Sequence, residues 1–253
     1  MCKTRYNAFM NIHKGGSSMF RLYQRNRLNF ALVWIWIYVA VFSLADALSG
    51  ALGIEKSITA PLSLVLSAIL WCWLRRYGLK ENHGLRLFRG SAGQYLYFLP
   101  LVVICSSNLW FGVRLEFTPV ETVLYLLSML CVGFLEEIIF RGFLYHALRE
   151  RGVRFAILIS GVTFGFGHIV NLLNGAEFLP TLLQVCYATA IGVLFTVIYH
   201  RSGSLRPCII AHCAVNMLSA FAVERSRGAD IVVAVLMVVI SLVYAFWIWK
   251  RTE

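Results

Sequence analysis

Six residues able to carry out acid–base or hydrogen-bonding chemistry lie inside runs of apolar sequence. They are Glu136, Glu137, Arg141, His168, His212 and Asn216. A charged side chain at the centre of a membrane span costs about 2.5–3.5 kcal/mol on insertion scales, so such residues are rare there and commonly functional. A carboxylate beside an imidazole can take a proton from water near neutral pH. The set therefore indicates an acid–base site inside a membrane.

Helical spacing sorts these residues into short stripes. Glu137 and Arg141 are four residues apart, so they share a helix face and can pair. Glu136 is rotated by about 100° from its neighbour, so the two carboxylates need not have the same role. Asn216 lies one turn beyond His212 on the same face. Each helix is thus expected to present a polar stripe to the interior of a bundle.

The depth of three of these residues can be estimated by counting along the chain. Glu136 and His168 each lie 16 residues from Gly152, where we expect a turn, so both are about 24 Å from it. His212 lies nine residues beyond the expected turn at Gly203, or about 14 Å. Part of the first distance is expected to be helix outside the membrane. We therefore expect all three helices to bring these side chains to a shared level.

The elements that must position these residues are membrane helices. The chain is 59% hydrophobic and 14% charged, whereas soluble domains are nearer half apolar and a quarter charged. The apolar residues form blocks close to the ~20 residues that a bilayer requires. The sequence therefore predicts an all-α, polytopic membrane helix bundle with about eight transmembrane helices, the fourth reaching Glu150. The predicted spans are 28–48, 57–74, 94–112, 120–145, 154–172, 178–199, 205–223 and 230–249.

The positive charges between these spans predict the orientation. Of the 23 lysines and arginines, only Lys56, Arg114, Arg225 and Arg227 fall on one side, which leaves 19 on the side of the termini. The positive-inside rule places that side in the cytosol. We predict a multi-pass protein of the cell membrane with both termini cytosolic. The net charge of +11 flanks the spans, so the expected partner is the lipid bilayer and not nucleic acid.

We predict a single membrane domain without internal repeats. A basic, cytosolic N-terminal segment covers residues 1–27, and the membrane-embedded domain covers residues 28–253. The polar motifs occupy a core at about residues 120–220.

Three polar runs carry a resemblance to a known family. They read Glu136-Glu137-Ile-Ile-Phe-Arg141, Phe164-Gly-Phe-Gly-His168 and His212-Cys-Ala-Val-Asn216. In this order, on separate predicted spans, they resemble the Glu-Glu-x-x-x-Arg, Phe-x-x-x-His and His-x-x-x-Asn motifs of the CPBP family. This family, also called ABI, contains CAAX proteases and bacteriocin-processing or immunity membrane proteins. Each motif alone is weak, but their joint occurrence is specific.

The resemblance implies an intramembrane, metal-independent glutamic-type endopeptidase that hydrolyses a peptide bond near the cytosolic face. Carried over residue by residue, it assigns water activation to Glu136 and His168. It assigns stabilisation of the oxyanion to His212 and Asn216. The remaining motif residues would organise the site or bind substrate; they are Glu137, Arg141 and Phe164. The implied substrate is a peptide or membrane protein, in peptide maturation, bacteriocin processing or immunity.

Several alternatives remain open from the sequence. Glu136, His168 and His212 could also bind zinc as three ligands with an open position, although the chain lacks the His-Glu-x-x-His motif of many metalloproteases. We favour catalysis without a cofactor. A non-catalytic scaffold that binds a regulatory or immunity partner is a second alternative. A proton-coupled transporter is a third, but no matching polar pattern between the two halves supports it.

Overall fold

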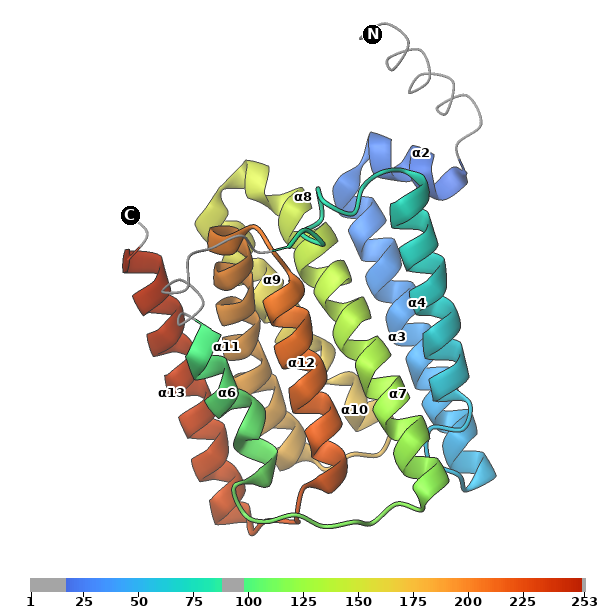
Figure 1. Cartoon of the computed structure of the whole chain (residues 1–253), viewed down its shortest axis with the longest axis vertical. Coiled ribbons are helices and arrows are strands. Elements are labelled where there is room, and N and C mark those ends of the chain that lie inside the picture. Colours follow the sequence, from blue (N-terminus) through green and yellow to red (C-terminus); the bar gives the residue numbers. More distant parts are fainter. Residues whose placement is uncertain (1–16, 88–97, 252–253) are drawn as a thin grey trace, which may run out of the picture.

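The computed structural model describes residues 17–87 and 98–251, and these residues form a bundle of helices (Figure 1). The all-α, polytopic architecture predicted from the sequence is confirmed. The first described helix, α2, and the C-terminal end of α13 lie on the same side of the bundle. Below, this side is called the termini face, and the opposite side is called the loop face.

The described helices occupy positions that the apolar blocks predict, while residues 94–97 of the third predicted span and 1–16 of the predicted N-terminal segment lie outside the described residues. In chain order they are α2 (Ser18–Arg25), α3 (Arg27–Leu52), α4 (Thr59–Arg76), α6 (Leu99–Ser106), η2 (Ser107–Leu109), α7 (Pro119–Glu136), η3 (Glu137–Tyr145), α8 (His146–Leu148), η4 (Arg149–Arg151), α9 (Val153–Gly167), α10 (Val170–Leu173), α11 (Phe178–Ser202), α12 (Arg206–Leu218), η5 (Ser219–Phe221) and α13 (Arg227–Arg251).

Five of the described helices are long and apolar enough to cross a membrane. The longest is the continuous helix Pro119–Arg151, of 33 residues, which confirms that the fourth predicted span extends beyond its apolar part. α4 is 18 residues long and ends in two arginines, and α12 is only 13 residues long and carries a polar motif. The total of eight spans therefore stays a prediction.

Local sequence explains where the central helix begins. Thr118 and Glu121 form a capping box in which each side chain binds the other residue's backbone N–H, and Pro119 occupies the first helical position. These interactions satisfy N–H groups that a helix start leaves without partners. A capping box thus precedes the long helix that carries Glu136, Glu137 and Arg141.

Small residues let α9 and α11 approach closely. A Cβ atom added at Gly165 would lie 2.6 Å from the backbone nitrogen of Thr189, and one at Gly161 would lie 2.8 Å from that of Val193. Glycines spaced four apart are a common feature of tight helix contacts in membranes. This contact fixes the position of α9, and hence of Phe164 and His168 at its end.

The short helix α2 lies within the predicted N-terminal segment and docks on the termini face. Its Phe20 stacks on Tyr77 with ring centroids 3.8 Å apart, and its Tyr23 packs edge-on against Phe30 and Trp73. Both α2 aromatic side chains are buried. The termini end of the bundle is therefore closed by an aromatic cluster.

Candidate intramembrane active site

Glu136 is held by side chains from two other helices. Tyr38 of α3 donates its hydroxyl to Glu136 Oε1 at 2.7 Å, and His212 Nε2 of α12 lies 3.3 Å from Glu136 Oε2. Glu136 is 9% exposed, in contrast to the fully buried Glu137 beside it. The two adjacent carboxylates therefore differ in environment, as their 100° separation suggested.

Glu137 lies at the centre of a buried charged group. Its Oε1 accepts from Arg141 Nη1 at 2.9 Å and from His212 Nδ1 at 2.8 Å. The side chains of Glu137 and Arg141 are both 0% exposed. The pairing of Glu137 with Arg141 that their spacing predicts is confirmed.

His212 bridges the two glutamates, because each of its ring nitrogens faces a carboxylate oxygen. An ionised carboxylate only accepts hydrogen bonds, so with both carboxylates ionised the imidazole between them would carry protons on both nitrogens. The group then holds two negative charges, on Glu136 and Glu137, and two positive charges, on Arg141 and His212. This neutrality matters because an unpaired buried charge is strongly destabilising.

Aromatic rings enclose the Arg141 guanidinium. Its central carbon lies 4.2 Å from the ring centroid of Phe164 and 5.8 Å from that of Phe195. Within the described residues, Arg141 Nε and Nη2 have no hydrogen-bond partner. The ring faces provide cation–π stabilisation in their place. Phe164, predicted to bind substrate, thus also packs on the charged group.

The tautomer of His168 is fixed by its own helix. Its Nδ1 lies 3.2 Å from the carbonyl oxygen of Phe164, which can only accept, so Nδ1 carries a proton. In the neutral ring, Nε2 is then the unprotonated nitrogen. An imidazole in this state can accept a proton from water.

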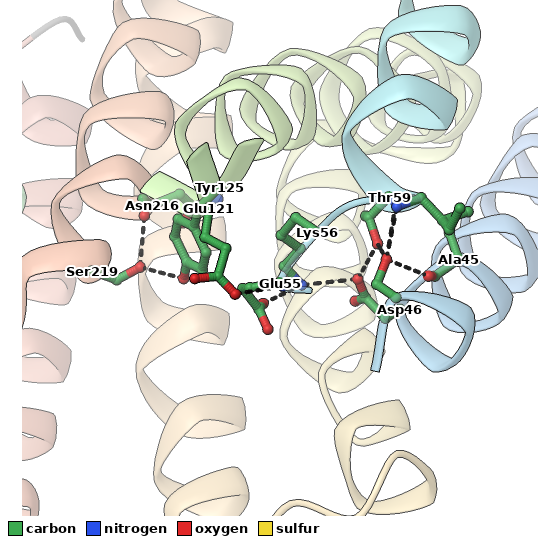
Figure 2. Close-up of polar contacts among 11 residues, drawn as sticks. Ala45, Asp46, Glu55, Lys56, Thr59, Glu121, Tyr125, Asn216 and Ser219 are labelled. Atoms are coloured by element: carbon green, nitrogen blue, oxygen red, sulfur yellow. Dashed lines mark hydrogen bonds and ion pairs between the residues drawn. The ribbon is translucent and has the colours of Figure 1, made fainter. Parts of the chain in front are cut away.

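Asn216 lies one turn beyond His212 and connects to the loop face (Figure 2). Its backbone carbonyl accepts from the Ser219 hydroxyl at 2.6 Å, and that hydroxyl is 2.9 Å from the Tyr125 hydroxyl of α7. This chain of contacts joins the end of α12 to α7 beside the predicted oxyanion donors.

A cavity of about 390 Å³ brings the motif residues together. A volume of this size is within the range of small-molecule and peptide-side-chain pockets, about 300–1,000 Å³. The predicted site residues that line it are Glu136, Phe164, His168, His212 and Asn216. Glu137 and Arg141 lie behind this wall. The structure therefore separates residues that can touch a substrate from residues that hold them in place.

A π-helical segment, η3, carries the supporting charges. It spans Glu137–Tyr145 and starts directly after Glu136. Two side chains bind its carbonyl oxygens: Ser160 donates to Phe140 at 2.9 Å, and His83 Nδ1 lies 2.7 Å from Gly142. π-Helical turns are rare and frequently occur at functional sites. Glu137 and Arg141 both belong to this segment.

Tyr38 is the contact that sequence reasoning missed. It lies in the first predicted span, 98 residues before Glu136, in a region without a family motif. The signal available was a tyrosine in the middle of an apolar run, away from the interface where tyrosines usually lie. That signal does not identify a partner.

Among the described residues, no group of three or more His, Cys, Asp or Glu side chains is arranged to hold a metal ion. The carboxylates of Glu136 and Glu137 are instead bound to His212. Glu136, His168 and His212 thus stay only a sequence-based suggestion for zinc, to be decided by experiment.

The fold and the site together define a class: a polytopic membrane protein with a carboxylate–histidine group at a cavity inside its helix bundle. Residues 118–218 match the family model described as type II CAAX prenyl endopeptidase Rce1-like. This segment contains all three motifs, so the match agrees with the resemblance of the motif core to the CPBP family. Comparisons with curated proteins and with solved structures give no match.

Proposed function

We propose that the protein is an intramembrane endopeptidase in which Glu136 and His168 activate a water molecule for attack on a peptide bond. The observation that carries the proposal is the Glu136 carboxylate at the cavity wall, held by Tyr38 and His212. The family match supports protease activity in general.

The proposed reaction starts with proton transfer. Glu136, or His168 through its Nε2, takes a proton from water as the water oxygen bonds to the peptide carbonyl carbon. The carbonyl oxygen becomes an oxyanion. When the carbon–nitrogen bond breaks, the proton passes to the leaving amine, so the products are one carboxylic acid and one amine. No cofactor is consumed.

The oxyanion requires hydrogen-bond donors. The side-chain amide of Asn216 and the Nε2–H of His212 are the proposed donors, and both residues line the cavity. The contact of His212 with Glu136, at 3.3 Å, is longer than its contact with Glu137, at 2.8 Å. The Nε2–H group is thus the one that can turn toward a substrate while Nδ1 stays bound. A donor of this kind is worth about 10²–10³-fold in rate.

A glutamine replacement tests the proposal, since it keeps the shape of Glu136 but removes its basicity. Purified Glu136→Gln protein in liposomes would be given a library of quenched fluorescent peptides, each with one apolar anchor segment. We expect complete loss of cleavage at normal membrane abundance, while the exposed control Glu150→Gln keeps full activity. Full activity of Glu136→Gln would contradict the protease proposal and favour a partner-binding scaffold.

The natural substrate class proposed here is a membrane-anchored peptide, as in peptide maturation, bacteriocin processing or immunity. The catalytic geometry does not depend on which membrane face the peptide comes from. The sequence-based prediction of cleavage near the cytosolic face is therefore independent of the proposed mechanism and needs its own test.

A further inference from the structure

The cavity extends from the site toward one end of the bundle only. Its lining residues farthest from Glu136 along the helices belong to the last turns of α3, the first turns of α7 and the segments that connect helices at the loop face. These residues are Asp46, Lys56, Tyr125, Asn174, Ser219 and Arg225.

Exposure rises along the same direction. Glu136 and His212 are 9% and 6% exposed, Asn216 and Ser219 are half-buried, and Asn174 at the loop face is exposed. This gradient is the one expected for a cavity that opens at the loop face.

In the other direction the bundle is filled with side chains. Phe140 and Phe195 form the floor of the cavity, and they are 3% and 1% exposed. Behind them lies a layer of apolar residues that are each at most 2% exposed. This layer consists of Phe143, Leu144, Tyr145, Leu194, Ile198 and Leu205. Protein interiors pack as densely as organic crystals, so this layer leaves no route for a peptide between the described residues.

The rim at the loop face is held by a network of polar contacts between helices (Figure 2). Lys56 donates to Asp46 at 2.9 Å and lies 6.0 Å from the Tyr125 ring centroid. Glu121 of α7 accepts the backbone N–H of Glu55 at 3.1 Å. Lys56 has φ of 56°, a left-handed conformation that costs free energy in a non-glycine residue and persists only when its surroundings hold it. The rim is therefore fixed by contacts between α3, α4 and α7.

The distribution of lysines and arginines indicates on which side of the membrane this rim lies. Of the 19 lysines and arginines that the structure describes, only four fall on the loop face, and two of them, Lys56 and Arg225, line the cavity. The positive-inside rule puts such a face outside the cytosol. The cavity would then open to the extracytoplasmic side.

We infer that the substrate peptide reaches Glu136 from the extracytoplasmic face, through the rim formed by the α3–α4 loop, the start of α7 and the α10–α11 loop. This inference rests on the proposed protease function. It replaces the expectation of cleavage near the cytosolic face. The substrate is a membrane-anchored polypeptide whose scissile segment has been exported, and not a lipid-modified C-terminus made in the cytosol.

Single cysteines can report the access route in intact cells. Ser43→Cys and Ser219→Cys place thiols at half-buried positions of the cavity wall with little change in shape, and Asn174→Cys places one at the exposed rim. Arg151→Cys marks the termini face. Ser160→Cys is the matched control, a fully buried serine on the termini side of the site. The parent protein would have the exposed Cys72 and Cys186, and also Cys2, replaced by alanine.

The probe is a charged maleimide that cannot cross membranes, which reacts with water-accessible thiols. In intact cells we expect Asn174→Cys, Ser43→Cys and Ser219→Cys to reach the labelling seen after permeabilisation. Arg151→Cys should label only after permeabilisation, and Ser160→Cys in neither case. Labelling of the cavity cysteines only after permeabilisation would overturn the inference, whether Asn174→Cys labels in intact cells or not.

The labelling result is independent of catalysis, so the two proposals can fail separately. Active Glu136→Gln protein with cavity cysteines that label from outside would reject the protease and keep the access route. Inactive Glu136→Gln protein with cavity cysteines that label only from the cytosol would keep the protease proposal and reject the access route.

Discussion

Two buried histidines, one on each side of the cavity floor, have opposite surroundings. His212 lies between the carboxylates of Glu136 and Glu137 on the cavity side. His83 lies in the closed termini end, where Nδ1 binds the carbonyl of Gly142 at 2.7 Å and Nε2 is 3.0 Å from the Tyr23 hydroxyl. The first is built to carry positive charge, whereas the second satisfies both nitrogens as a neutral ring.

The difference shows that burial alone does not mark a functional histidine. Both residues are at most 6% exposed, but of the two only His212 lines the described cavity and contacts carboxylates. His83 instead holds a carbonyl of η3 and packs edge-on against Phe143. The cavity side is thus organised for chemistry and the termini end for rigidity.

The largest effect is expected for the charges behind the cavity wall. Glu137→Ala or Arg141→Ala leaves an unpaired charge at 0% exposure, so each should reduce stability by about 3–5 kcal/mol and lower protein abundance in the membrane. The double variant Glu137→Gln/Arg141→Met leaves Glu136 and His212 balanced. It should recover abundance better than activity, as measured by immunoblot and peptide cleavage.

A surface pair provides the control for this prediction. Arg27 and Glu150 are 3.4 Å apart but 47% and 74% exposed, so replacing either by alanine should change stability by less than about 1 kcal/mol. Equal effects of the two pairs on abundance would show that the buried group does not depend on charge balance.

The second-largest effect is expected on the free energy of unfolding at low pH. Burial, and to a lesser extent nearby His146, lowers the pKa of His83 from 6.5 to about 4. Between these values the unfolded chain binds a proton that the folded protein does not, so stability is retained above pH 6.5 and lost as the pH falls toward 4. The loss is about 3 kcal/mol at most. Thermal unfolding in detergent across this range would measure it.

His83→Gln separates this residue from the other titrating groups, because the glutamine amide can donate to Gly142 and accept from Tyr23 without ionising. The variant should unfold with a weaker dependence on pH over the same range. An unchanged pH dependence would mean that His83 is not the acid-sensitive group.

A third prediction compares two tyrosines. Tyr38 contacts a carboxylate at the cavity, whereas Tyr23 contacts the neutral His83 at the closed end. Tyr38→Phe removes a donor to the Glu136 carboxylate, and hydrogen bonds to charged groups contribute about 1.5–3 kcal/mol. We expect cleavage to slow by about 10- to 100-fold at normal abundance. Tyr23→Phe, which loses a contact with the neutral His83, should leave the rate near that of the wild type. Similar rates for both variants would remove Tyr38 from the site.

The smallest effect is expected from removal of metal ions. If Glu136 and His168 activate water directly, a strong chelator should leave the cleavage rate unchanged and purified protein should lack stoichiometric zinc. Elemental analysis and chelator titration measure both. Activity that is lost to the chelator and restored by zinc would establish the zinc-dependent alternative.

The sequence by itself determined the helices, the motif residues and the pairing within one helix. Hydropathy and helical spacing depend on neighbours in the chain, so the all-α bundle, the long fourth helix and the Glu137–Arg141 pair could be predicted. The basic residues between the helices supplied the orientation as a prediction.

Only the tertiary structure decided how the helices face one another. The contact of Tyr38 with Glu136 spans 98 residues, and that of His212 with Glu137 spans 75. The floor under the cavity likewise depends on which faces of α11 and η3 meet. Such contacts are set by the rotation and crossing of packed helices, which small residues such as Gly165 permit and which no local pattern specifies. For the same physical reason, the direction in which the cavity opens could be found only from the packed bundle.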